Sequence, residues 1–145
     1  VDAMVDICKE EMEHFKMVHE KLKERGFKLG FERKDPYVND LSKYLKKNQN
    51  DGSRQGHFVK QMLFAAMIEA RSCERFKILS EQLKDPDLKT FYRFLMESEA
   101  RHYVTFLNFA KKYGGKIDVN QKWNDFLVFE AELMKQYGSN ETIHG

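Results

Sequence analysis

The sequence has 145 residues, of which 41% are hydrophobic, 33% charged and 13% aromatic, enough apolar surface for a sizeable core in one domain. Global disorder is therefore excluded, and because 25 basic residues nearly balance 23 acidic ones, the net charge of +2 does not by itself indicate a nucleic-acid partner. A membrane-spanning segment is excluded and secretion is not expected, since the sequence lacks both a run of about 18 apolar residues and a signal-peptide pattern after Val1.

Glycine and proline residues divide the chain into four long segments that are free to be helical. In chain order these are residues 2–25, 57–84, 87–113 and 118–137, with a stretch from 26 to 56 long enough for a crossover containing one short helix. In the first three segments, residues of one face recur at alternating steps of three and four, which is typical of amphipathic helices. The short turn at Pro86 predicts that its flanking helices are antiparallel neighbours. The sequence therefore predicts an all-α antiparallel bundle in one domain, residues 1–145.

Two segments carry the same Glu-x-x-His spacing, which places a carboxylate and an imidazole on one helix face. The first motif is Glu11 with His14 and the second is Glu99 with His102. The second motif follows the first at an offset of 88 residues. The surroundings repeat in the same register: Phe15 matches Tyr103, Gly26 matches Gly114, Lys28 matches Lys116 and Leu29 matches Ile117. We interpret this as an internal duplication of a helical hairpin.

The ionisable groups occupy positions where a helix of a bundle normally carries leucine. Glu11, Glu69, Glu99 and His102 lie on the core-facing stripes, and His14 borders its stripe beside Phe15. Burying several carboxylates together costs several kcal/mol unless positive charge accompanies them, and no Lys or Arg shares these positions. Two divalent cations would supply that charge, and Glu oxygens with His nitrogens suit iron or manganese. The sequence therefore predicts a metal site formed by Glu11, His14, Glu69, Glu99 and His102.

A four-helix carboxylate site uses one further single-Glu helix. Glu69 precedes Glu99 by thirty residues, so the matching partner of Glu11 is expected upstream of Val1, on a bundle helix that this chain lacks. Glu74 is a rival to Glu69, but it lies about 140° around the helix and is better interpreted as a surface group. Cys73 is interpreted as a small core residue.

Three strings resemble the MiaE-type tRNA hydroxylases, which are ferritin-like non-haem di-iron monooxygenases. They are Cys8 to Phe15, Met67 to Phe76 and Glu97 to Tyr103, and the similarity extends over nearly the whole chain, including Glu130 to Glu132. The resemblance implies a ferritin-like antiparallel four-helix bundle with an extra C-terminal helix and with its first helix missing from this chain.

The resemblance also implies the reaction. Its substrate is the prenylated, usually methylthiolated adenosine beside the anticodon of certain tRNAs, and dioxygen with two electrons hydroxylates a terminal methyl of the isopentenyl group. By this analogy Glu11 and Glu99 bridge two iron ions, His14 and His102 each bind one, and Glu69 is a terminal ligand. The implied partners are tRNA, dioxygen and an electron donor, and the implied location is cytoplasmic, which agrees with the presence of only two cysteines.

Basic residues of the crossover segment are the candidates for RNA contact. They are Arg33, Lys34, Lys46, Lys47 and Arg54. Phosphates attract such clusters, although a solvated loop has the same composition.

Two other interpretations of the whole sequence stay open. One is a ferritin-like protein that oxidises or stores iron without an organic substrate. The other is a metal-free helical scaffold whose acidic side chains are simply paired.

Overall fold

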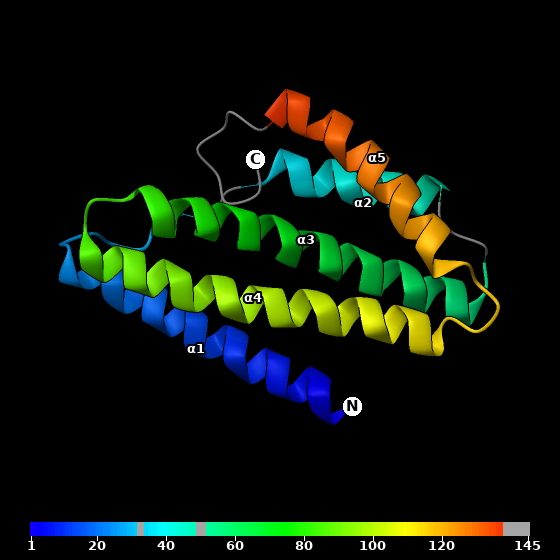
Figure 1. Cartoon of the computed structure of the whole chain (residues 1–145), viewed down its shortest axis with the longest axis horizontal. Coiled ribbons are helices and arrows are strands. Elements are labelled where there is room, and N and C mark those ends of the chain that lie inside the picture. Colours follow the sequence, from blue (N-terminus) through cyan, green and yellow to red (C-terminus); the bar gives the residue numbers. More distant parts are fainter. Residues whose placement is uncertain (32–33, 49–51, 138–145) are drawn as a thin grey trace. The chain divides into compact units, whose positions relative to one another are not determined.

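The computed structural model describes residues 1–31, 34–48 and 52–137, which fall into two compact units, residues 1–34 and 35–145. The first unit contains α1 (Asp2–Glu24), and the second contains α2 (Pro36–Asn48), α3 (Arg54–Gln82), α4 (Pro86–Tyr113) and α5 (Val119–Tyr137) (Figure 1). All regular elements of the described residues are helices, as the sequence predicts. The prediction that both units form one domain stays a prediction.

The first unit is a single long helix closed by a glycine. Beyond Arg25, Gly26 adopts φ +75°, a left-handed conformation that side chains disfavour. The Gly26 amide donates to the Lys23 carbonyl at 3.0 Å, and the Phe27 amide donates to the Leu22 carbonyl at 2.9 Å. This pair of hydrogen bonds is the Schellman motif, which satisfies carbonyl groups at a helix end. The sequence pattern therefore places the end of α1 correctly.

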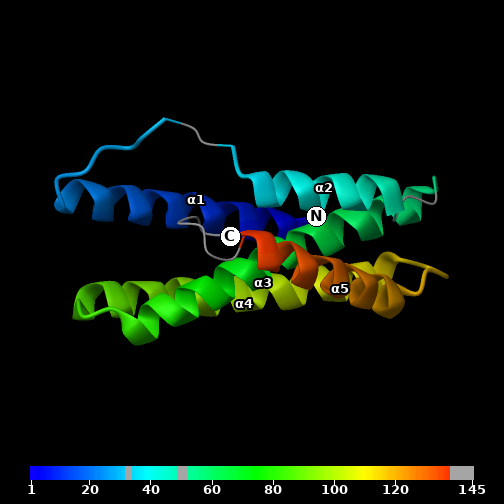
Figure 2. The ribbon, with the colours of Figure 1, turned by 90° about the horizontal axis from the view of Figure 1, so that it is seen from above.

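In the second unit, α3 and α4 run antiparallel and side by side over most of their length (Figures 1 and 2). The connection is short because Asp85 caps α4, with its side chain accepting hydrogen bonds from the Asp87 and Leu88 amides. Helix α3 begins at Arg54, slightly before the predicted start. The reason is Ser53, whose hydroxyl accepts a hydrogen bond from the Gly56 amide at 2.8 Å and allows Gly56 to lie inside the helix.

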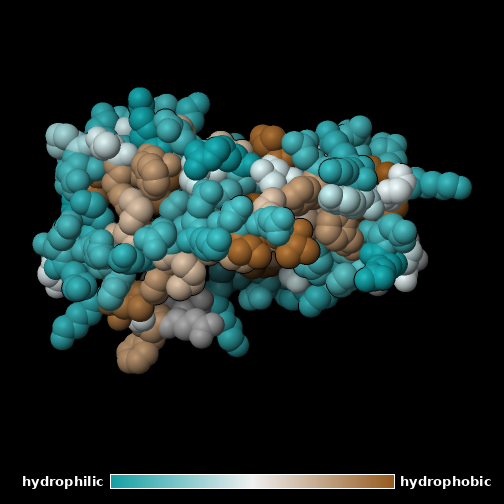
Figure 3. All heavy atoms as spheres, turned by 90° about the horizontal axis from the view of Figure 1, so that it is seen from below, coloured by the Kyte–Doolittle hydropathy of each residue, from teal (hydrophilic) through white to brown (hydrophobic). Residues whose placement is uncertain are grey.

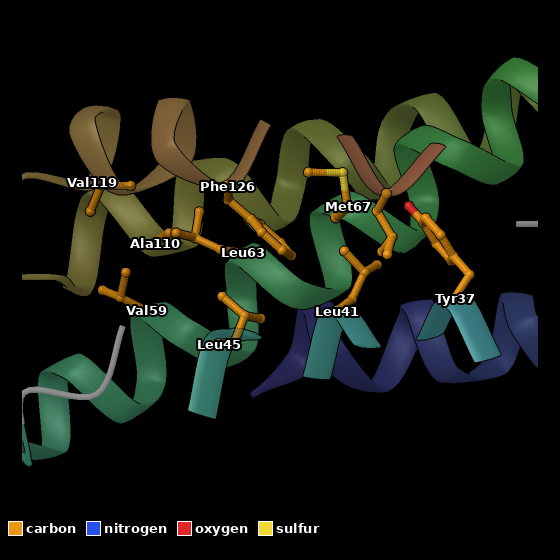
Figure 4. Packing of buried hydrophobic residues seen from close by; sticks show 10 residues of the cluster. Tyr37, Leu41, Leu45, Val59, Leu63, Met67, Ala110, Val119 and Phe126 are labelled. Atoms are coloured by element: carbon orange, nitrogen blue, oxygen red, sulfur yellow. The ribbon is translucent and has the colours of Figure 1, made fainter. Parts of the chain in front are cut away.

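Helices α2 and α5 cover another face of α3 and build the main hydrophobic core. Its fully or nearly fully buried members come from α2, α3, α4 and α5, and the labelled side chains of Figure 4 point toward one another. They include Tyr37, Leu41, Leu45, Val59, Leu63, Met67, Ala110, Val119 and Phe126. Each buried Leu, Val, Phe or Met side chain of this set contributes roughly 1.5–3 kcal/mol of hydrophobic stabilisation. The core thus fixes α3, the helix that carries Glu69.

The end of α4 approaches its neighbours too closely for any side chain but that of glycine. A Cβ atom at Gly114 would lie 2.6 Å from the Ala110 carbonyl oxygen, 3.0 Å from Val59 and 3.1 Å from Val119. Gly114 has φ −72°, so the space rather than the backbone angle requires glycine here. The residue therefore allows α3, α4 and α5 to meet at one end of the second unit.

Hydrophobic side chains also reach the surface. Figure 3 shows one face of the molecule, on which they lie in patches among hydrophilic residues. Exposed examples in the second unit are Ile78, Phe94, Val104 and Val128. Apolar atoms make up much of any protein surface, so scattered residues of this kind need no partner to explain them. Among the described residues, no helix is both long and apolar enough to span a bilayer.

Candidate metal centre

The antiparallel pairing of α3 and α4 brings three predicted ligands together. Glu69 comes from the middle of α3, and Glu99 and His102 come from one face of α4, one turn apart. One ligand atom from each of these side chains lies within 4.8 Å of the others. Glu99 is 6% exposed and His102 is 3% exposed, so the cluster is largely withdrawn from water. The second unit therefore gathers the half-buried Glu69 carboxylate with the buried Glu99 carboxylate and His102 imidazole.

This donor set fits the metal ions that the sequence analysis predicts. Carboxylate oxygens and an imidazole nitrogen bind divalent iron and manganese, and a cation would compensate the acidic charge that the site withdraws from water. A thiol is close by, but Cys73 donates its S–H to the Met96 carbonyl at 3.6 Å. Burial, followed by the Glu99 and Glu74 carboxylates, raises the pKa of the Cys73 thiol. Without a bound metal, Cys73 is thus held in the thiol form.

The other two predicted ligands lie on α1, in the first unit. Within that helix, Glu11 Oε1 lies 3.6 Å from His14 Nδ1, so the Glu-x-x-His spacing does place both groups on one face. The two Glu-x-x-His helices also end at nearly equivalent positions, α1 at Glu24 and α4 at Tyr113. These features agree with the predicted duplication. The assignment of Glu11 and His14 to the same site as Glu69 stays a prediction.

The rival carboxylate Glu74 lies on the surface. Its Oε2 accepts a hydrogen bond from Arg71 Nη1 at 2.6 Å, and its side chain is 67% exposed. This surface pairing is what the helical angle between Glu69 and Glu74 predicts. On α4, Arg101 donates hydrogen bonds to the Glu97 carbonyl and the Ser98 hydroxyl.

A second buried polar cluster was not predicted. The Glu130 carboxylate on α5 accepts hydrogen bonds from the Tyr37 hydroxyl at 3.0 Å and from Arg71 Nη2. Tyr37 is fully buried and Glu130 is 5% exposed. Burial, followed by the Glu130 charge, raises the pKa of the Tyr37 phenol above its usual range, so the phenol remains a donor. The available signal was a glutamate spaced four residues from Phe126 and three from Leu133 on an apolar helix face.

The candidate RNA-contact residues are spread along the chain. Lys46 and Lys47 lie exposed in the last turn of α2, and Arg54 is the exposed first residue of α3. Lys34 is exposed at the end of the first unit, and Arg33 lies outside the described residues.

Comparison with known proteins identifies the family of this chain. The family model described as tRNA-(MS[2]IO[6]A)-hydroxylase (MiaE) matches residues 1–145. The chain belongs to the MiaE family. The resemblance found in the sequence is therefore confirmed.

Two curated MiaE relatives carry the name tRNA 2-(methylsulfanyl)-N(6)-isopentenyladenosine(37) hydroxylase. The protein from Salmonella typhimurium is 35% identical over 137 residues, covering 92% of this chain and 47% of the relative. The protein from Pseudomonas putida is 34% identical over 144 residues, covering 99% of this chain and 67% of the relative. The chain thus spans about half the length of the first relative and two thirds of the second.

A solved structure confirms the fold class. Protein 43 with aldehyde deformylating oxygenase activity from Synechococcus has a TM-score of 0.83 and 26% sequence identity to this chain. The match covers 99% of this chain and 68% of that protein. The all-helical, ferritin-like class that the sequence predicts for the MiaE chain is therefore correct.

Proposed function

We propose that this chain is the catalytic part of a tRNA-modifying non-haem di-iron monooxygenase. The reaction would hydroxylate the isopentenyl group of a prenylated, commonly methylthiolated adenosine next to the anticodon. The names of the two curated relatives support the substrate class. The observation that carries the proposal is the convergence of Glu69, Glu99 and His102, whose ligand atoms lie within 4.8 Å of one another.

The proposed ligands of two iron ions are Glu11, His14, Glu69, Glu99 and His102. In carboxylate-bridged bundles, two helices each supply Glu-x-x-His and the other two each supply a Glu. Helices α1 and α4 carry the first kind of motif and α3 carries the second. In this assignment the Glu11, Glu69 and Glu99 carboxylates and the His14 and His102 imidazoles would together hold the two ions. Manganese suits the same donors, so the metal must be measured.

The bound metal pair would supply the oxidising power that no side chain has, because a methyl C–H bond is inert to acid–base chemistry. In the balanced reaction, the C–H bond, dioxygen, two electrons and two protons give the alcohol and one water. An external electron donor must provide the two electrons.

The protein itself would hold the ligands and exclude water from the site. Phe76 follows Glu69 by seven residues and Tyr92 precedes Glu99 by seven, so in antiparallel helices both lie about 10 Å to the same side of the cluster. Their rings are 5.6 Å apart, and Tyr92 also contacts Phe91 at 5.5 Å. This aromatic layer provides an apolar boundary on one side of the ligands, which suits a hydrocarbon substrate. We also propose a cytoplasmic location, consistent with the free thiols of Cys8 and Cys73.

The direct test is the mass of the modified nucleoside. Purified protein loaded with Fe(II) is incubated with prenylated tRNA, dioxygen and a reductant, and the tRNA is then digested for mass spectrometry. We expect a gain of one oxygen atom on the prenylated adenosine. Glu99→Gln should abolish this gain. Glu97→Gln removes the charge of an exposed carboxylate on the same helix and should retain the gain.

Two results would contradict the proposal. Iron oxidation without any change in the nucleoside would favour a ferritin-like iron-handling protein. Failure to retain any transition metal after growth with ample iron would favour a metal-free scaffold.

A further inference from the structure

A small cationic cavity lies between the last turns of α2 and the first turns of α3. Its volume is about 170 Å³, and Lys46, His57 and Lys60 line it together with Phe64. The remaining lining residues, Ser42, Leu45 and Gln61, are neutral, so none of the described residues that line the cavity is acidic. The ionisable side chains among its described lining residues are therefore all basic.

Lys60 is the residue that sets this cavity apart from ordinary surface lysines. It is only 8% exposed, and within the part of the chain that the structure describes its ammonium group has no hydrogen bond or ion pair. Among the described residues its ammonium nitrogen is not one of the buried polar atoms without a partner, so the aliphatic stem of Lys60 is buried while its charged end reaches solvent in the cavity. Exposed basic residues, Lys46 and His57, border the same cavity. A bound anion would give Lys60 its missing partner.

The size of the cavity restricts the anion. Pockets for nucleosides and other drug-sized ligands occupy about 300–1,000 Å³. A water molecule takes about 30 Å³ of liquid, so this cavity has room for a group equal to about five or six waters. A phosphate group fits this space, whereas a complete nucleotide does not. The ammonium groups of two lysines and one imidazole suit phosphate oxygens.

We propose that the cavity binds a backbone phosphodiester of the RNA substrate, with Lys60 as the central contact and Lys46 and His57 at its rim. This inference rests on the proposed function for its choice of RNA. It adds Lys60 and His57 to the contact surface and makes Lys46, rather than Lys47, the α2 lysine that touches phosphate.

The cavity is separate from the candidate metal centre. Lys60 precedes Glu69 by nine residues on α3, which corresponds to about 14 Å along the helix and half a turn around it. A phosphate bound there therefore lies outside the candidate metal centre. Contacts of this kind fix the register and orientation of a nucleic acid. Lys60 is thus a positioning residue for the RNA.

The first experiment measures RNA affinity across a salt series. Fluorescence anisotropy with a labelled anticodon stem-loop RNA compares the unmodified protein with Lys60→Met and with Lys77→Met, an exposed lysine of the same helix that the cavity does not include. Both variants lose one positive charge. We expect Lys60→Met to raise Kd about tenfold and to lower the slope of log Kd against log salt by about one. Lys77→Met should change Kd less than about twofold.

Equal effects of Lys60→Met and Lys77→Met would overturn the proposal, because they would show a general charge effect. Methionine retains the aliphatic stem of Lys60, and thermal unfolding reports whether the variant is folded. If Lys60→Met does not fold, Lys46→Met at the exposed rim takes its place in the comparison, and we expect it to raise Kd about threefold. An effect equal to that of Lys77→Met would again overturn the proposal.

The second experiment does not depend on metal, dioxygen or RNA. Inorganic phosphate is titrated into ¹⁵N/¹³C-labelled protein, and the side-chain signals of Lys60 and His57 are followed by NMR. Saturable shifts that vanish in Lys60→Met support an anion site even if the nucleoside is never hydroxylated. Absence of these shifts, together with unaltered RNA affinity, overturns the site even if hydroxylation succeeds.

Discussion

The second unit contains two buried polar clusters that differ in how their charge is arranged. In the first, Glu130 meets the Arg71 guanidinium and the Tyr37 hydroxyl, so the chain itself supplies cation and hydrogen-bond donor. In the second, Glu69 and Glu99 gather with His102, all of them groups that bind metals. The first cluster joins three helices, and the second gathers ligands at the α3–α4 contact. We therefore expect the glutamates of the two clusters to have distinct roles within one small unit.

This difference in charge suggests how experiments can distinguish a buried cluster that stabilises the fold from one that binds metal. A structural cluster should lose folding stability when one partner is removed, because the other charge stays buried and unpaired. A metal cluster should lose its metal instead, and the metal-free protein should hardly be destabilised when a carboxylate becomes an amide. Variants of the Glu130 cluster should thus lose stability but not metal, and variants of the Glu99 cluster should lose metal but little stability.

The largest effect is expected at His102. His102→Ala removes a proposed ligand, so metal affinity should fall by at least about 100-fold, more than the loss of a supporting hydrogen bond usually causes. Plasma mass spectrometry after equilibrium dialysis against Fe(II) measures this change. Exposed Glu97→Gln on α4 is the control and should bind metal normally. Retention of full metal content by His102→Ala would contradict the ligand assignment.

The next effect concerns the structural cluster. Arg71→Met leaves the Glu130 carboxylate buried without its cation, and we expect the free energy of unfolding to fall by about 3–5 kcal/mol. Urea denaturation of the metal-free protein measures it. Arg93→Met, at an exposed position of α4, should change stability by less than about 0.5 kcal/mol. A loss at Arg71 as small as that at Arg93 would show that the buried ion pair has no structural role.

A smaller effect is expected at Tyr37. Tyr37→Phe keeps the ring in the core but removes the donor to Glu130, which should lower the free energy of unfolding by about 1–2 kcal/mol. The metal content should stay unchanged, and this result would distinguish the two clusters again. Denaturation and metal analysis of the same preparation provide both readouts.

The smallest effect is expected at the cap of α4. Asp85→Ala removes the acceptor for the Asp87 and Leu88 amides and should lower the free energy of unfolding by about 1 kcal/mol. Thermal denaturation measures it. Asp118→Ala is a matched variant, because Asp118 accepts from the Gln121 amide just before α5. A neutral result at Asp85 would mean that Pro86 alone is sufficient to begin α4.

The helices could be predicted from the sequence because their signals are local. Repeats of three and four residues, Pro86 and the glycines mark where α1, α3, α4 and α5 lie, and the bounds agree to within a few residues. The α3–α4 convergence of Glu69, Glu99 and His102 followed from the same periodicity combined with a short turn. Local pattern is sufficient there because two consecutive helices must pack as neighbours.

The remaining features depend on contacts between distant segments. Tyr37, Arg71 and Glu130 lie on three helices, and no spacing within one helix shows which charge another helix will meet. Lys60 gave no signal either, because its burial results from the way α2 packs against α3. The sequence therefore indicated candidate ligands that repeat a motif, but not groups defined only by tertiary packing.

The central claim is that the Glu99 cluster binds metal and the Glu130 cluster does not. Anaerobic addition of Fe(II) should raise the Tm of the unmodified protein, since a ligand that binds only the folded state stabilises it. The account predicts that Glu130→Gln lowers the starting Tm but keeps this rise, whereas Glu99→Gln loses the rise. An undiminished Fe(II)-induced rise in Glu99→Gln would contradict it.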